Sequence, residues 1–287
     1  MLTKSYSILN KFGIEVKVAN CFVGENLQDQ TTGAQAFNAN LSSLTPSGIA
    51  GFVGYFAASD IFGKSSRAYG ATVLKQLSAY ASKVSKTTGG IVDVQVTKKL
   101  FRIHHDLIFK DNLPISEVLI SPKESAVSVA YWGLLPFSRG NIHISSVNAS
   151  APATINPNYF LLDYDVQQQI GTAKISRAVG RVQPMAQYIT SETQPGLATV
   201  PVNGTQQQWA KWIKSSYRSN YHYISTAAMM AEELGGIVDT ELRVYGTENV
   251  RVVDASVLPM QVCGHLTATL YAVAEKAADA IKAAHGL

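Results

Sequence analysis

The chain has 287 residues, of which 46% are hydrophobic and 15% charged, a composition typical of folded globular proteins and not of disordered ones. The formal net charge is +4, but the basic residues are scattered and form no run interleaved with aromatic residues, which argues against nucleic-acid binding. Cys21 and Cys263 are far apart and belong to no CxxC motif, so the sequence predicts neither a disulfide framework nor a metal site.

Export and membrane signals are weak in this sequence. The most apolar stretch, residues 49–58, is too short and too rich in glycine to cross a bilayer, so no membrane partner is expected. The first residues show neither the apolar core nor the small-residue cleavage site of a signal peptide. Glycosylation sequons begin at Asn40, Asn148 and Asn203, which fits secretion and chance equally. The localisation therefore stays open.

The first elements predicted along the chain are a short helix over residues 5–13, closed by Gly13, and a strand over residues 14–18 with the alternating pattern IEVKV. A helix and a strand without a preceding start signal are typical of the middle of a larger protein. Residues 21–60 are rich in Gly, Ser, Thr, Asn and Gln, which predicts mostly loop.

The middle of the chain predicts helices, then strands, then another helix. Apolar residues at helical spacing indicate one helix around residues 73–84 and another around residues 96–108. Three strands separated by Pro and Gly are predicted between residues 115 and 146. Residues 164–182 again have a helical pattern.

Two later helices have more specific signals. Thr205 followed by Gln208 is a capping box, which predicts that a helix starts at Thr205. Apolar residues recur with a period of 3.6 from Leu266 to Ile281, which predicts a terminal helix over residues 266–284. We expect part of this apolar stripe to be exposed, and an exposed stripe favours self-association.

Four segments carry a joint motif pattern. They are VGENLQDQTT at residues 23–32, YWGLLPFSRGNIHISS at 131–146, YRSNYHYISTAAMM at 217–230 and GTENVRVVDASVLPMQVCGHLTATLYAVAEKAADAIK at 246–282. Together they resemble the C-terminal part of the glucose-methanol-choline (GMC) oxidoreductases, most closely those of the fungal FAD-dependent glucose dehydrogenase and glucose oxidase type. The pattern is too extensive for chance agreement.

The resemblance implies an α+β fold. An antiparallel sheet substrate domain, with its sheet in about residues 115–200 and helices on one side, is accompanied by C-terminal remnants of an FAD-binding, Rossmann-like domain. On this assignment residues 1–30 are a remnant of the FAD-binding domain, residues 31–232 are the substrate-binding domain, and residues 233–287 return to the FAD-binding domain. No GxGxxG motif follows an initial strand in this sequence, so weak FAD binding is expected for this chain alone.

The resemblance also implies FAD as the cofactor and a catalytic histidine pair, His222 and His265. Oxidising an alcohol removes a hydroxyl proton while a hydride leaves carbon for flavin N5. One imidazole accepts the proton near neutral pH and the other positions the hydroxyl, with His265 as the base and His222 as its partner. His265 precedes the terminal helix, whose N–H groups and dipole favour a reduced, negatively charged flavin.

Further site residues follow from the same resemblance. The implied cofactor contacts are Asp254, Ala255, Leu266 and Thr267, and the implied contacts to sugar hydroxyls are Arg218 and Asn220, with Ser219 between them. Arg and Asn side chains suit a polyhydroxylated ligand because they offer several hydrogen-bonding atoms. The remaining histidines are interpreted as surface or core residues: His104, His105, His143 and His285.

Two departures from the family pattern affect the site. The family sequence after the first histidine is close to HPVGTAAMM, whereas this chain has Tyr223, Ile224 and Ser225 after His222, so the loop is expected to be shifted. The family's sugar-binding glutamate before WGLLPF is replaced by Ala130, whose methyl group cannot accept a hydrogen bond. This replacement puts glucose specificity in question.

Two functional hypotheses follow. The first is an FAD-dependent oxidoreductase that acts on the CH–OH group of a small sugar or alcohol once a flavin domain is supplied. The second is a non-catalytic fragment or pseudoenzyme that at most binds carbohydrate, which Ala130 and the altered His222 loop favour. Fungal members of the family are commonly secreted. The sequence does not specify the substrate, nor whether oxygen or another acceptor reoxidises the flavin.

Overall fold

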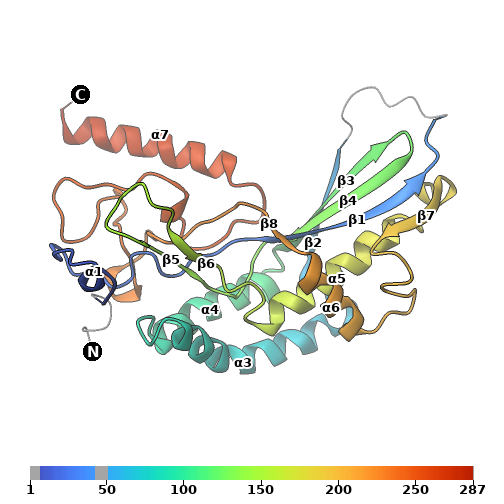
Figure 1. The fold of residues 1–287 in the computed structure, drawn as a ribbon, viewed down its shortest axis with the longest axis horizontal. Helices are drawn as coiled ribbons and strands as arrows, with labels where there is room; N and C mark the ends of the chain where they lie inside the picture. Colours follow the sequence, from blue (N-terminus) through green and yellow to red (C-terminus); the bar gives the residue numbers. More distant parts are fainter. Residues whose placement is uncertain (1–6, 43–50, 287) are drawn as a thin grey trace.

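An antiparallel sheet of six strands lies at the centre of the structure, a computed structural model that describes residues 7–42 and 51–286 (Figure 1). The strands run in the order β2–β3–β4–β1–β7, and β8 also pairs with β1. Their bounds are β1 Thr31–Ala39, β2 Phe52–Ala57, β3 Pro114–Lys123, β4 Ala126–Gly133, β7 Ile189–Gln194 and β8 Arg218–Ser219. β1 comes first in the chain yet lies inside the sheet, so the sheet forms only when distant segments pair.

Helices cover one face and one end of this sheet, and a small hairpin stands apart (Figure 1). The helices are α1 Ser7–Lys11, α2 Ala58–Phe62, α3 Ser66–Thr87, α4 Val94–Phe109, α5 Asp163–Val179, α6 Gln206–Ser216 and α7 Thr267–Ala284. The hairpin is β5 Asn141–His143 with β6 Thr154–Asn156, and the 3₁₀ turns are η1 Gly63–Ser65, η2 Met185–Gln187, η3 Glu232–Leu234 and η4 Ala255–Val257. The predicted capping box at Thr205 is confirmed at the start of α6.

The alternation of β4 shows how the sheet acquires a covered face. Val129 and Tyr131 are buried and pack in one core with Ile170 of α5 and Trp209 of α6. Because successive residues of a strand point to opposite faces, Trp132 and its same-face neighbours lie on the other side. One face of the sheet therefore packs against α5 and α6, and the opposite face carries Trp132.

A second core joins α3 and α4 to the end of the sheet. The predicted apolar face of α3 is confirmed, since Leu77 and Val84 are buried in this core together with Phe101 and Phe137. The carboxylate of buried Asp165 accepts hydrogen bonds from the backbone N–H groups of Phe137 and Ser138, at 2.8 and 2.9 Å. The loop after β4 is therefore held firmly beside the sheet.

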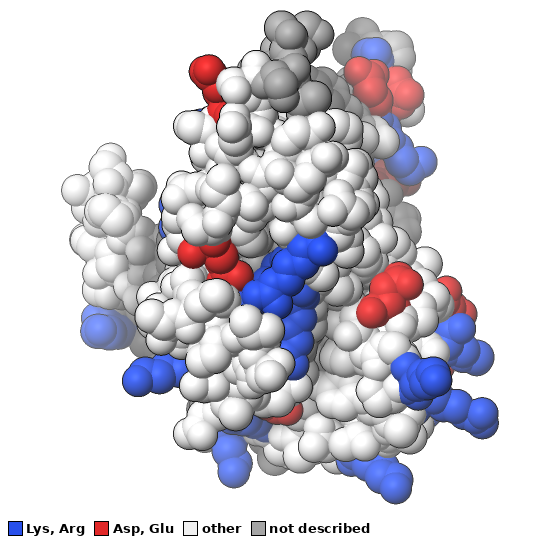
Figure 2. All heavy atoms as spheres, turned by 90° about the vertical axis from the view of Figure 1, so that its right-hand side faces the viewer, with Lys and Arg blue, Asp and Glu red and all other residues white. Residues whose placement is uncertain are grey.

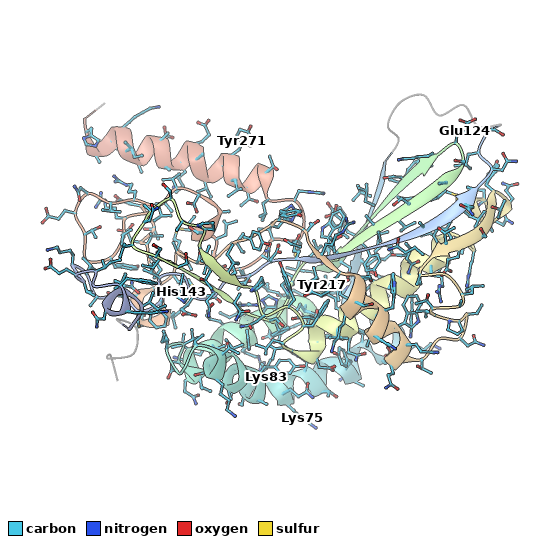
Figure 3. The ribbon with its side chains drawn as sticks, viewed as in Figure 1. Lys75, Lys83, Glu124, His143, Tyr217 and Tyr271 are labelled. Carbon is cyan, nitrogen blue, oxygen red and sulfur yellow. The ribbon has the colours of Figure 1, made fainter. Side chains whose placement is uncertain are left out.

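α7 lies apart from the sheet, across the loops of the last third of the chain (Figure 1). Among the described residues of α7 only Ala277 is buried. Ile281 is 39% exposed and Tyr271 is 71% exposed. Tyr271 points outward from the helix (Figure 3). The apolar stripe predicted from the sequence is thus partly exposed, and its self-association stays a prediction.

Charge is spread over the molecule without a single dominant sign. Figure 2 shows Lys and Arg interspersed with Asp and Glu on the face at the far end of the sheet. At the end of α5, Arg177 pairs with Glu192 at 2.6 Å, and Arg181 lies 3.8 Å from the same carboxylate. None of the helices in residues 7–42 and 51–286 is long and apolar enough to span a membrane.

Two predicted elements near the start of the chain were wrong. Residues 14–18 form no strand: their apolar residues alternate as predicted, but no described segment pairs with them. The described part of residues 21–60 is not mostly loop, because it contains β1 and β2, and residues 43–50 lie outside the described residues. β1 is polar, and buried Gln35 donates a hydrogen bond to the Ala173 carbonyl at 2.6 Å. Pairing on both edges of β1 thus overrides its weak strand propensity.

Candidate active site

His222 and His265 are distant in sequence and meet in the structure. His222 lies in the loop after β8, and His265 lies two residues before α7. Their ring centroids are 5.9 Å apart and their planes are inclined by 79°. Ile224 and Leu266, which follow closely after the two histidines, are buried and pack with Leu258. Hydrophobic packing of three separate segments therefore fixes the approach of the two imidazoles.

One row of residues across the sheet forms a wall beside His265. Taken in their pairing order across β8, β1, β4, β3 and β2, these residues are Arg218, Thr32, Trp132, Glu117 and Tyr55. Residues paired across antiparallel strands share a face, so this row lies opposite the core of α5 and α6. The Trp132 ring is 5.6 Å from the His265 ring, in an edge-to-face arrangement.

Glu117 places a buried carboxylate in this wall. Its Oε1 atom accepts a hydrogen bond from His265 Nε2 at 2.8 Å, and the residue has no exposed surface. Ala130, which appeared from the sequence to leave the site without a carboxylate, pairs with Leu119 one row away. Sequence analysis missed Glu117 because strand register decides which residues share a row. The one available signal was an acidic residue inside the apolar strand ISEVLI.

Three hydrogen bonds hold His222 in place. Its backbone N–H donates to Asp29 Oδ1 at 2.9 Å, its Nδ1 lies 2.7 Å from Gln30 Oε1, and its carbonyl accepts from Gln261 Nε2 at 2.7 Å. Asp29 also accepts a hydrogen bond from the Ser219 hydroxyl at 2.6 Å. The segment VGENLQDQTT therefore supports the His222 loop, a role that its sequence did not reveal.

The surroundings of His222 favour a neutral imidazole. Burial lowers the pKa of His222 below the ordinary histidine value of 6.5, and the neighbouring His265 lowers it further. The Asp29 carboxylate acts in the opposite direction. Near neutral pH the His222 ring is therefore uncharged and able to accept a proton.

The loop after His222 keeps a left-handed backbone residue without glycine. Ser225, which stands where the family pattern has glycine, has φ of +77° and is 1% exposed. Such a conformation is costly for a residue with a side chain. The Ser225 hydroxyl offsets part of this cost, because it donates to the Leu258 carbonyl at 2.6 Å and accepts from Gln28 Nε2 at 2.8 Å.

The predicted cofactor residues gather around the start of α7. Leu266 is buried, and Thr267 is exposed at the first helical position. Among the described side chains none caps this helix start, so its first N–H groups are available to a ligand. Ala255 packs against the Leu266 cluster, whereas the Asp254 carboxylate is exposed and accepts a hydrogen bond from Ser256 N–H at 2.7 Å.

The predicted substrate residues stand in β8 and directly after it, shortly before His222. Arg218 is exposed at one end of the wall, paired with Thr32. Asn220 Nδ2 lies 3.1 Å from His222 Nδ1 and 3.4 Å from Gln30 Oε1. The structure therefore places both residues at the start of the His222 loop.

The other four histidines lie outside this site. His104 and His105 are buried in α4, His143 hydrogen-bonds buried Glu25 at 2.9 Å, and His285 follows α7. His143 lies well away from the sheet (Figure 3). The described part of the chain contains no cluster of three His, Cys, Asp or Glu residues that could hold a metal ion.

Comparison with known families and proteins agrees with this geometry. The family model described as GMC oxidoreductase matches residues 136–274. The chain is 42% identical over 273 residues to the glucose oxidase-like protein fsoC of Humicola fuscoatra, which covers 95% of this chain and 45% of that protein. This chain carries the C-terminal domain of a GMC oxidoreductase.

Other relatives match over a similar extent. Glucose oxidase of Aspergillus carbonarius is 33% identical over 96% of this chain and 45% of its own length. The chain thus spans about half the length of the curated relatives that it matches. An FAD-dependent oxidoreductase from Chaetomium thermophilum has a similar structure, with a TM-score of 0.78 at 25% identity, covering 98% of this chain and 52% of that one. A fungal aryl-alcohol oxidase has the same fold, with a TM-score of 0.79 at 23% identity over 96% of this chain and 51% of its own.

Proposed function

We propose that this GMC domain supplies the proton-accepting and substrate-holding side of an FAD-dependent site that oxidises the CH–OH group of a sugar or alcohol. One observation carries the proposal. The two imidazoles face each other at 5.9 Å, and each has one nitrogen tied to a buried acceptor, Gln30 for His222 and Glu117 for His265. In the described part of the chain, His222 Nε2 and His265 Nδ1 have no hydrogen-bond partner, so both atoms are open to a bound ligand.

The contacts give the two histidines different roles. We assign the base to His222, because its lowered pKa keeps it neutral and its Nε2 atom is free to accept the hydroxyl proton. His265 donates its Nε2 proton to Glu117, which fixes the ring and leaves Nδ1 as an acceptor suited to a neighbouring hydroxyl of the substrate. This assignment exchanges the roles that sequence reasoning gave to the pair. The carboxylates of Glu117 and Asp29 stabilise the positive charge that the site gains when it takes up the proton.

The described residues fit a flavin ring beside this pair. The start of α7 offers uncapped N–H groups and the positive end of a helix dipole next to His265, and both favour an anionic ring edge. Leu266, Thr267 and Ala255 would hold the ring, while Asp254 sits at the exposed edge of the same segment. When bound, FAD supplies the acceptor for the hydride that leaves the substrate carbon.

The wall beside His265 suits a small hydroxylated ligand. Tyr55, which is 46% exposed, gives it an aromatic surface, and Arg218 and Asn220 supply hydrogen-bond donors around the His222 loop. The next row, with Ala130 and Leu119, adds small and apolar side chains. The names of the relatives, glucose oxidase and aryl-alcohol oxidase, agree with sugars and alcohols as the substrate class.

Flavin binding by the chain tests the proposed function. FAD is titrated into the purified chain, and quenching of flavin fluorescence is followed to saturation. We expect saturable binding that Thr267→Val weakens by about tenfold, because the Thr267 hydroxyl at the start of α7 is one of the hydrogen-bonding groups proposed to hold the ring. His285→Ala, at the other end of α7, is the matched control and leaves the affinity unchanged. Quenching that never saturates, in a chain that does bind sugars, would favour the non-catalytic carbohydrate-binding hypothesis instead.

Substitutions at Glu117 separate its hydrogen bond from its charge. Glu117→Leu removes the partner of His265 Nε2, and we expect the rate of flavin reduction by substrate to fall about 10–100-fold, the value of a hydrogen bond to a charged group. Glu117→Gln keeps an acceptor oxygen and costs less. Stopped-flow absorbance of the flavin measures both rates. Equal rates in Glu117→Leu and the unmodified chain would show that His265 needs no such support.

A further inference from the structure

A chain of buried amides connects the two sides of His222. Gln30 and Gln261 have 0% and 3% of their surface exposed. Gln261 Nε2 donates to the backbone carbonyl of His222 at 2.7 Å, Gln30 Nε2 donates to Gln261 Oε1 at 3.4 Å, and Gln30 Oε1 lies 2.7 Å from His222 Nδ1. The chain of contacts thus starts at the main chain of His222 and ends at its ring.

The backbone carbonyl decides the orientation of every amide in this chain. A carbonyl oxygen only accepts, so the Gln261 side chain must present its NH₂ group to it and its oxygen to Gln30. Gln30 must then present its NH₂ group to Gln261 and its oxygen to His222. Turning either amide over would bring two oxygen atoms or two NH₂ groups together, with nothing nearby to compensate inside a buried network.

The last contact determines which ring nitrogen of His222 carries the proton. At 2.7 Å from an oxygen that only accepts, Nδ1 must be the donor. Asn220 Nδ2, 3.4 Å from the same oxygen, is a second donor that converges on it. The 3.1 Å contact between Asn220 Nδ2 and His222 Nδ1 is then the approach of two donors to one shared acceptor.

We propose that Gln30 and Gln261 are positioning residues, which hold His222 as the Nδ1–H tautomer and so direct the Nε2 lone pair to the substrate hydroxyl. The proposal rests on the proposed role of His222 as a base. Gln28 supports this chain of amides, because its Nε2 donates to the Pro259 carbonyl at 3.1 Å and its Oε1 accepts from the Gln261 backbone N–H at 3.4 Å. Sequence analysis assigned no role to any of these three glutamines.

The charged and titratable groups around His222 do not impose this tautomer by themselves. His265 faces it from the start of α7, at 5.9 Å between ring centroids, and Asp29 faces its backbone from the segment before β1. Neither contacts His222 Nδ1 among the described hydrogen bonds, so Gln30 is the group that selects the protonated nitrogen.

Nitrogen NMR of this chain labelled with ¹⁵N-histidine tests the proposal. Two-bond ¹H–¹⁵N correlations distinguish protonated from unprotonated ring nitrogens, and the His222 signals are assigned by their loss in His222→Gln. Above the ordinary histidine pKa we expect a single Nδ1–H form. Gln30→Leu is expected to give a mixture of both tautomers, and so is Gln261→Met, because it frees the Gln30 amide to turn. Gln30→Glu keeps an acceptor oxygen, so it retains the Nδ1–H form and raises the pKa of His222 by about one unit or more.

The controls make the result decisive. Gln207→Leu, on the exposed surface of α6, leaves the His222 signals unchanged. An Nε2–H form in the unmodified chain would overturn the proposal even if no variant folds, and so would an unchanged tautomer in a folded Gln30→Leu chain. Because the measurement needs neither flavin nor turnover, it separates the two claims. If His222 keeps a single tautomer but the chain binds no flavin, only the proposed function is contradicted. If substrate reduces the flavin while His222 is a mixture of tautomers, only the role of Gln30 and Gln261 is contradicted.

Discussion

Replacing His222 with glutamine is expected to lower the rate at which an alcohol or sugar reduces bound flavin by about 10²–10⁴-fold, the range that general-base catalysis contributes. Glutamine keeps a polar side chain of similar reach but cannot take up the hydroxyl proton. Stopped-flow absorbance under anaerobic conditions gives the rate. His285→Gln, which changes a histidine outside the site, is the control and keeps the original rate.

The pH dependence of the same rate follows from the neutral state of His222. A base must be unprotonated, so the rate falls when the pH drops below its pKa. Because burial and His265 lower that pKa below 6.5, the rate is expected to persist to a more acidic pH than an ordinary histidine would allow. A rate that is lost already above pH 6.5 would contradict the assignment of the base to His222. The loss of rate in His222→Gln, about 10²–10⁴-fold, and the pH profile of the unmodified chain then describe the same proton transfer.

The second large effect concerns stability in acid and comes from His104 in α4. This residue is fully buried beside Phe137, with ring centroids 4.7 Å apart. Burial, and then the nearby Arg139, lower its pKa from 6.5 to about 3. Protonation therefore favours the unfolded chain. The stabilising contribution is complete above pH 6.5 and is lost as the pH falls towards 3, at about 1.4 kcal/mol per pH unit.

His104→Leu removes this dependence because leucine has a similar volume and no charge to bury. We expect the difference in unfolding free energy between variant and unmodified chain to grow by about 1.4 kcal/mol per pH unit below pH 6.5. Urea unfolding at a series of pH values measures it, and His285→Leu, at an exposed position, is the control. Parallel pH curves for His104→Leu and the unmodified chain would show that His104 does not titrate on unfolding.

The sequence allowed most helices to be predicted because their signals are local, whereas the fold class followed from the family resemblance. The capping box at Thr205, the buried face of α3 and the terminal helix each depend on residues a few positions apart. β1 could not be predicted in this way, since its polar residues form a strand only when β4 and its other neighbours pair with it.

The residues of the candidate site show the same difference between signals in the sequence and contacts that depend on the fold. His222 and His265 were found through motifs that extend over many residues, and the structure brings them together. Glu117 and Gln30 were missed because their roles depend on strand register and on the orientation of a buried amide, which adjacent residues do not determine. The same limit applies to Ala130. The sequence indicated that this residue left the site without a carboxylate, but the carboxylate comes from Glu117 on the neighbouring strand.

The anaerobic absorbance spectrum of the chain loaded with FAD tests the central claim most directly. The protein is incubated with FAD and freed of unbound flavin, and spectra are recorded before and after addition of a sugar or an aryl alcohol. Substrate is expected to bleach the oxidised flavin band in the unmodified chain, while the band persists in His222→Gln. An oxidised band that persists in the unmodified chain with every sugar and alcohol tested, or equal bleaching in His222→Gln, would contradict the account.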